Sequence, residues 1–158
     1  MLTVKQIKAK VDLARNGIDQ QTSNIISDNE AKILDYIRKD QLYEKGINGN
    51  NEVIGRYRQT YTSESVGGWG NNSKIIGKGL PKKMGSPYNF VWSGYTESKF
   101  GLKYSSYTLN IFNKGDSAST LTVRYGESIF LLTDENKNKL SSEIIRPNLI
   151  KYFKTIFN

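Results

Sequence analysis

The chain has 158 residues, 37% of them hydrophobic, which is enough for one domain that buries roughly 70% of its unfolded surface. It contains neither cysteine nor histidine. This absence excludes disulfides, thiol nucleophiles, Ser-His and Cys-His relays, and metal sites built from imidazole or thiolate ligands. Lys and Arg exceed Asp and Glu by 23 to 15, and the net charge of +8 favours contact with phosphates or with an acidic protein surface.

The first ten residues, MLTVKQIKAK, carry three lysines where a secretory signal would need an apolar run. No stretch of the sequence approaches the roughly 20 apolar residues of a membrane helix. We therefore expect a soluble protein, made in a reducing cytoplasm, with no membrane partner.

Apolar residues near the start recur at spacings of three and four. They are Val4, Ile7, Val11, Ala14 and Ile18. This spacing puts them on one face of a helix, with the lysines outside that face. We predict a helix over about residues 3–19, which the polar stretch DQQTSN ends or bends.

A second helix is marked at both ends. Ser27 stands three residues before Glu30, which is the spacing of a capping box. Gly46 lies where the end of a helix favours a residue that tolerates left-handed geometry. These signals predict a helix over residues 28–45.

A long segment rich in glycine and lysine comes next. Residues 66–87, VGGWGNNSKIIGKGLPKKMGSP, hold six glycines, four lysines, two prolines and no acid. Connections of this length are typically functional or mobile, and glycine makes them costly to order unless a neighbour does so. We predict a projecting loop or hairpin, here called the arm, over about residues 63–87. The alternative is a loop folded back on its own domain, with lysines that only aid solubility.

Two sets of side chains are candidate contacts of the arm and its flank. The apolar set, in which tryptophan is typical of interface anchors, is Trp69, Ile75, Ile76, Leu80 and Met84. The basic set, offered to nucleic-acid phosphates, is Arg56, Arg58, Lys74, Lys78, Lys82 and Lys83.

Residues 88–132 are predicted to contain a small antiparallel sheet. Residues 107–111 alternate apolar and polar side chains, which is the period of a strand. Residues 102–104 alternate on the opposite parity, so a turn or bulge is expected near Ser105. The stretch STLTVRYG fits either a strand or a short helix.

The C-terminal quarter is predicted to be helical. Asp134 and Glu135 place acids in the first turn of a helix over about 134–145, before Pro147, and a last helix is expected over 148–157. The predicted fold is a single α+β domain over residues 1–158, with N- and C-terminal helices flanking a small antiparallel sheet and a projecting arm.

Nucleotide and calcium motifs fail when tested residue by residue. A P-loop would use Gly77 and Lys78, but Asn72 stands at the place of its first glycine and Gly79 at the place of its hydroxyl. Asp134, Asn136 and Asn138 match the first three ligand positions of an EF-hand loop. The required Gly and final Glu are replaced by Lys139 and Ile145, so a capped helix is the better interpretation. We expect neither cofactor nor metal.

A pair of carboxylates could still serve a glycosidase, which needs neither His nor Cys. Glu64 and Glu97 flank the segment without acids, and a basic wall-lysing enzyme is a consistent alternative. Nothing in the sequence selects this pair over any other, and no catalytic residue is predicted.

Three stretches carry a resemblance to a known family. The first, at 35–62, has a helix ending in Gln-Leu-x-x-x-Gly-Ile-Asn-Gly and then an Ile-Gly-x-Tyr turn; its positions are Gln41, Leu42, Gly46, Ile47, Asn48, Gly49, Ile54, Gly55 and Tyr57. The second, at 107–136, contains a Tyr-Gly-x-x-Ile-Phe-x-Leu motif formed by Tyr125, Gly126, Ile129, Phe130 and Leu132. The third is IIRPNLIKYF at 144–153.

This pattern, over roughly two-thirds of the chain, resembles the neck or tail-completion proteins of tailed bacteriophages, the head-to-tail connector rings, and most closely those of crAss-like phages of gut bacteria. The chain departs from the family at Ser93, where a Thr is frequent, and at Leu131, where a Gly is frequent. The arm has no counterpart in the family.

The resemblance implies a structural virion protein without catalysis. Such a protein would form a homo-oligomeric ring between the portal or adaptor and the tail, around the DNA channel, after assembly in the host cytoplasm. We expect the arm to reach a neighbouring subunit or ring through Trp69 and the pair Ile75–Ile76. The alternative is a basic DNA- or RNA-binding module.

Overall fold

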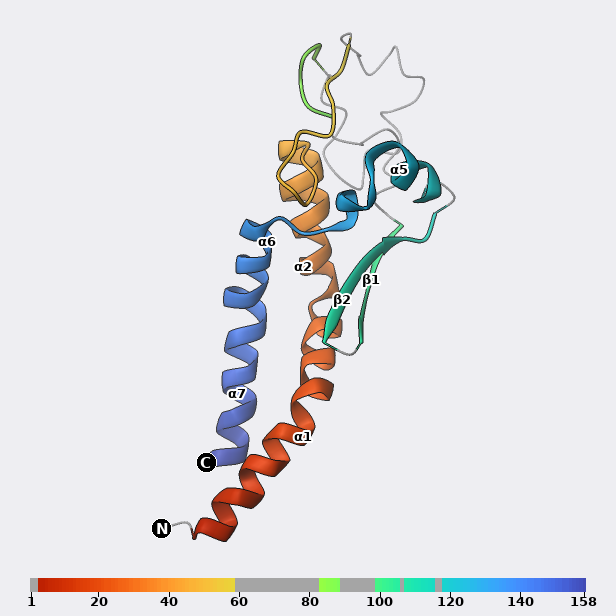
Figure 1. Cartoon of the computed structure of the whole chain (residues 1–158). Coiled ribbons are helices and arrows are strands. Elements are labelled where there is room, and N and C mark those ends of the chain that lie inside the picture. Colours follow the sequence, from red (N-terminus) through yellow and green to blue (C-terminus); the bar gives the residue numbers. More distant parts are fainter. Residues whose placement is uncertain (1–2, 59–82, 89–98, 106, 116–117) are drawn as a thin grey trace.

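The computed structural model describes residues 3–58, 83–88, 99–105, 107–115 and 118–158. Two long helical rods dominate it. They lie side by side and run in opposite directions, so that both ends of the chain lie at the same end of the molecule (Figure 1). A two-stranded antiparallel sheet leans against the first rod, and this combination of helices and a small sheet confirms the α+β class.

The first rod consists of α1 (Val4–Asp28), α2 (Glu30–Asp35) and a π-helical segment, η1 (Tyr36–Lys45). A capping box starts it, because the Thr3 hydroxyl accepts a hydrogen bond from Gln6 N while the Gln6 side chain accepts one from Thr3 N. Its end matches the prediction: Gly46 has φ 61° and ψ 41°, the left-handed geometry that glycine tolerates.

Two predictions about the middle of the first rod are wrong. The first helix does not end at 19 but runs through DQQTSN to Asp28, and Ser27 lies inside it rather than capping the next helix. The irregular residue is Asn29, whose φ is −112° and whose side chain donates a hydrogen bond to Ile25 O at 2.8 Å. Burial of Ile25 and Ile26 favours the helix there over the cap that the local sequence offers.

The second rod consists of α6 (Asp134–Lys139), a π-helical segment, η3 (Leu140–Ile145), and α7 (Arg146–Phe157). The predicted break before Pro147 is wrong, since the rod continues through it. In a regular α-helix the proline ring would clash with the carbonyl four residues earlier. The wider π turn that precedes Pro147 changes this spacing, and the proline occupies the first turn of α7.

Ion pairs join α2 and η1 of the first rod to α6 and η3 of the second. They are Lys32–Glu143 at 3.0 Å, Asp40–Lys139 at 3.2 Å and Lys45–Glu135 at 2.6 Å. Their side chains are about one-third to one-half exposed, so each contributes little to stability. From one pair to the next, the residue number rises along the first rod and falls along the second, so the two rods are antiparallel.

The sheet is a hairpin of β1 (Phe100–Ser105) and β2 (Thr108–Asn113), paired from Phe100 with Asn113 to Ser105 with Thr108. The predicted turn near Ser105 is confirmed. The Tyr104 hydroxyl donates to Asp19 Oδ1 of α1 at 3.0 Å, which ties the hairpin to the first rod. The stretch STLTVRYG forms a helix, α5 (Ala118–Tyr125), and a short 3-10 helix, η2 (Glu127–Phe130), comes after it.

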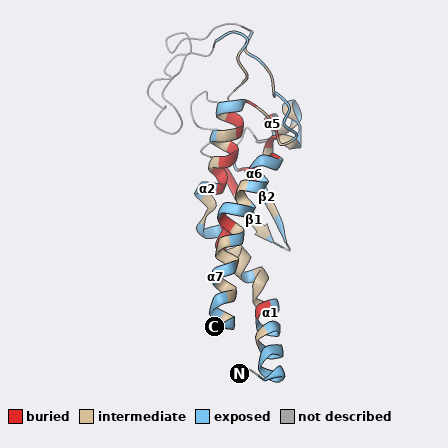
Figure 2. Ribbon diagram, turned by 90° about the vertical axis from the view of Figure 1, so that its left-hand side faces the viewer, coloured by how far each residue is buried: buried red, intermediate tan, exposed pale blue. Residues whose placement is uncertain are grey.

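The core lies where the two rods meet the segment after α5. The most completely buried apolar side chains, each at most 1% exposed, are Ile33, Ile37, Leu42, Ile129 and Ile144. Figure 2 shows the buried residues concentrated around the rods at this level, whereas the first turns of α1 are exposed. The core therefore stabilises one part of the elongated molecule and leaves the start of α1 uncovered.

Candidate interaction surfaces

A buried amide joins the two longest stretches of the resemblance. Gln41, near the end of η1, is fully buried. Its Nε2 donates to Leu131 O at 2.8 Å, and its Oε1 accepts from Thr133 N at 3.1 Å. One side chain thus satisfies two backbone groups of the segment that leads into α6.

The loop after Gly46 lies against the same segment. The Asn48 side chain accepts hydrogen bonds from the backbone N–H groups of residues 50 and 52, which holds a tight turn. Gly49 N donates to Ser128 O at 2.8 Å. A Cβ at Gly49 would come within 2.7 Å of Leu131 O, so glycine is needed here for close approach. The residues named in the two stretches therefore form one packed unit that fixes the position of the chain leaving this loop.

The C-terminal end of the arm is held against the chain that precedes the arm. Gly85 N donates to Tyr57 O at 2.8 Å, and Arg56 Nη1 donates to Gly85 O at 2.7 Å. We call residues 56–58 and 83–88 the arm base. Because these bonds join residues that are far apart in sequence, the arm base is a defined surface at the far end of the molecule from the chain termini (Figure 1).

The arm base brings together part of the predicted contact set. Arg56, Arg58, Lys83 and Met84 are all exposed there, and Met84 is 68% exposed. Arg56 also has a structural role, through its bond to the Gly85 carbonyl. The remaining predicted contacts lie outside the described residues: Trp69, Lys74, Ile75, Ile76, Lys78, Leu80 and Lys82.

A second exposed surface lies on the first turns of α1. Val4 is 84% exposed, Ile7 46% and Val11 48%, whereas Ala14 on the same face is buried. The spacing of the sequence predicts this apolar face correctly but does not show which part of it is covered. The signal that distinguishes the two parts is the flanking charge, because Lys5, Lys8 and Lys10 crowd the exposed part.

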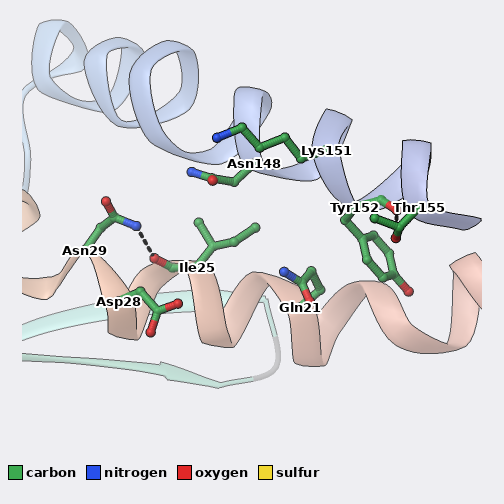
Figure 3. A pocket seen from close by; sticks show the side chains of 8 residues that line it. All are labelled: Gln21, Ile25, Asp28, Asn29, Asn148, Lys151, Tyr152 and Thr155. Atoms are coloured by element: carbon green, nitrogen blue, oxygen red, sulfur yellow. Dashed lines mark hydrogen bonds between the residues drawn. The ribbon is translucent and has the colours of Figure 1, made fainter.

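A polar groove runs between α1 and α7. It has a volume of about 380 Å³ and is lined by Gln21, Ile25, Asp28, Asn29, Asn148, Lys151, Tyr152 and Thr155 (Figure 3). Three of its polar groups are used within the helices: Asn29 donates to Ile25 O, Asn148 donates to Ile144 O, and Thr155 Oγ1 donates to Tyr152 O at 2.7 Å. The groove is the space left between two packed helices, and these side chains bond to their own helices.

A charge cluster couples the rods near the core. The Glu143 carboxylate accepts a hydrogen bond from Tyr36 at 2.9 Å and pairs with Lys32 at 3.0 Å. The Lys32 ammonium and, to a smaller extent, the Tyr36 hydroxyl hold the pKa of Glu143 below its ordinary value. Burial and, after it, the bond to Glu143 raise the pKa of Tyr36. Both pKa shifts therefore arise from contacts that join the first rod to the second, and they are explained by a structural role.

The polar groups considered for metal binding have structural roles. Among the described residues, acidic side chains form no cluster able to hold a metal ion. Asn136, an EF-hand position in the sequence, is 2% exposed and donates to Tyr36 O at 2.8 Å, while Thr133 caps α6. The helix-cap interpretation is therefore confirmed. Glu64 and Glu97, the glycosidase candidates, lie outside the described residues.

None of the helices in the described ranges has the length and apolar character needed to cross a bilayer. A scan against protein-family models and searches of curated proteins and of solved structures found no match to this chain.

Proposed function

We propose that this protein is a structural subunit of a bacteriophage neck, without catalysis. It would form a homo-oligomeric ring that joins the portal or adaptor to the tail and surrounds the DNA channel. It would assemble in the host cytoplasm and remain in the virion.

One observation carries the proposal: exposed contact surfaces lie at opposite ends of an elongated body (Figure 1). The arm base presents Met84 and basic side chains at one end, and the start of α1 presents Val4, Ile7 and Val11 at the other. A connector subunit needs separate surfaces for its neighbours in the ring and for the components on either side of the ring. The body between them consists of two helical rods packed around a core.

The type of assembly proposed, a connector ring, comes from the family resemblance of the sequence. Its residues include Gln41, Asn48 and Gly49, and these have structural roles in the packed unit beneath the arm base. A positive net charge of +8 suits a subunit that lies close to DNA in a channel.

The test uses particles of the phage that encodes the chain. Mass spectrometry should detect the protein in purified virions, and antibody labelling in electron micrographs should place it at the head–tail junction. Its absence from mature particles, or labelling confined to the capsid shell, would refute the proposal.

The double variant Trp69→Ala with Ile76→Asp tests the arm: ring assembly is expected to fail while circular dichroism shows the same helix content. Intact rings would contradict the role of these anchors.

A second candidate function is a DNA- or RNA-binding module, favoured by the exposed Arg56, Arg58 and Lys83 of the arm base. Affinity for duplex DNA should then fall steeply with salt, and Arg58→Glu with Lys83→Glu should weaken it further. Lys151→Glu with Lys154→Glu, on α7, makes the same charge change elsewhere. Equal losses from both pairs would indicate only the effect of net charge.

A further inference from the structure

The exposed face at the start of α1 continues a helix-packing surface. Val4, Ile7 and Val11, here called the α1 seam, belong to the same three-and-four spacing as Ala14, Ile18 and Ile25. Farther along, this side of α1 packs against α7: Ala14 and Ile25 are buried, and a side chain at Gly17 would collide with the Tyr152 hydroxyl. The seam is therefore the part of this surface that stays half to largely exposed among the described residues.

The seam is presented on a formed helix. The reciprocal hydrogen bonds of Thr3 and Gln6 start α1 immediately before Val4. Isolated helical turns are marginal in water, so a capped and continuous helix reduces the ordering that a partner would have to impose. All three seam residues are β-branched, so their side chains have few rotamers to lose when a partner packs against them.

The charges beside the seam are of one sign. Lys8 and Arg15 lie on one flank and Lys10 on the other. Within the described ranges none of the three forms an ion pair. In a helix pair, the positions flanking the apolar seam choose the partner by charge. A second copy would bring Lys and Arg against Lys and Arg in either orientation, which disfavours self-pairing at this surface.

We infer that the α1 seam docks an amphipathic helix of a partner protein, one whose apolar residues repeat at spacings of three and four and whose flanking positions carry Asp and Glu. This inference deepens the proposed function by giving the chemistry of one partner surface. It is tested on the full chain in solution, so it can fail while the protein is still found in the neck, or succeed when it is not.

The probe is a fluorescent peptide of about three heptads, with Ile and Leu in the seam and Glu on both flanks. A matched peptide has the same seam with Lys on both flanks. Fluorescence anisotropy with the full chain should show binding of the Glu peptide and none of the Lys peptide. The affinity should fall as salt rises from about 0.05 M to about 0.5 M, because screening shortens the reach of exposed charges.

Two variants locate the contact. Ile7→Asp should reduce the affinity about tenfold or more, since it places a charge in the apolar seam. Leu13→Asp is the matched control: Leu13 is 61% exposed on the same helix but on the opposite face, so affinity should stay within about twofold. Lys8→Glu with Lys10→Glu and Arg15→Glu should exchange the preference of the chain from the Glu peptide to the Lys peptide.

Several results would overturn the inference. Equal binding of both peptides would indicate a non-selective apolar surface, and binding of neither would remove the site. Self-association in sedimentation experiments that is lost in Ile7→Asp but not in Leu13→Asp would assign the seam to a second copy. Binding to phosphatidylserine vesicles that Ile7→Asp abolishes, without peptide binding, would assign it to a membrane surface.

Discussion

Replacing Gln41 by leucine should destabilise the protein far more than the loss of one polar side chain would on a surface. Leucine has a similar size and is apolar, so the buried volume changes little. The substitution removes the pair of hydrogen bonds to Leu131 O at 2.8 Å and from Thr133 N at 3.1 Å. The cost is therefore set by the two backbone groups that remain.

These two groups are not equally protected from water. Thr133 is 5% exposed, so its N–H would be left without a partner, at about 1–3 kcal/mol. Leu131 is 53% exposed, and water can replace part of the bond to its carbonyl. The expected loss is about 2–4 kcal/mol, a large share of the 5–15 kcal/mol that is typical for a domain.

Urea unfolding monitored by circular dichroism measures this loss. With a slope of about 2 kcal/mol per molar urea, the midpoint should fall by roughly 1–2 M. Gln20→Leu is the matched control, because the same substitution on the exposed face of α1 should change stability by no more than about 0.5 kcal/mol. Equal midpoints for the two variants would refute the role given to Gln41.

Gln41→Glu provides a second readout. The carboxylate keeps the acceptor for Thr133 N but sets a negative oxygen against the Leu131 carbonyl. Burial should raise the pKa of this carboxyl above its unfolded value, so the variant binds more protons when folded and loses stability as the pH rises through that range. A stability difference from the wild type that does not depend on pH would contradict this.

Two further predictions concern neighbouring contacts. Gly49→Ala should cost about 1–3 kcal/mol in urea unfolding, because a Cβ there meets the backbone of Leu131, and an unchanged midpoint would show that the loop relaxes freely. For Glu143, whose pKa is lowered from 4.5 by Lys32 and Tyr36, the charged carboxylate stabilises the fold above that value and the contribution is lost as the pH falls through the lower folded value. The stability gap between wild type and Glu143→Gln should therefore narrow as the pH falls from neutral to below about 4, and a constant gap would exclude the carboxylate as its source.

Local sequence signals predicted the fold where no distant contact opposed them. The left-handed end at Gly46 and the turn near Ser105 depend on residues within a few positions. The signal from Ser27 failed because burial of Ile25 and Ile26 outweighs an available cap. The sequence alone does not decide whether STLTVRYG forms a strand or a helix. Its β-branched residues favour a strand only when a neighbouring strand exists.

The interaction surfaces were only partly predictable, for a related reason. The apolar face of α1 is evident from its spacing, but which part of it α7 covers depends on where the rods meet. The pairing of Arg56 with Gly85 joins residues far apart in sequence, and no local pattern indicates it. Composition predicts the arm, most of which lies outside the described residues, whereas the pairing at its base required tertiary structure.

The wide turns of η3 can absorb a change in chain length. Each residue of a regular helix turns the next face by about 100°, and a π turn accommodates one residue more than an α turn. Deleting a single residue within η3 would therefore let that segment revert to α geometry while α7 keeps the face that it turns to α1. The same deletion in the first turns of α7 has no wide turn to absorb it, so it would rotate the rest of that helix and move Tyr152 away from Gly17. A one-residue deletion should accordingly be better tolerated within η3 than within α7.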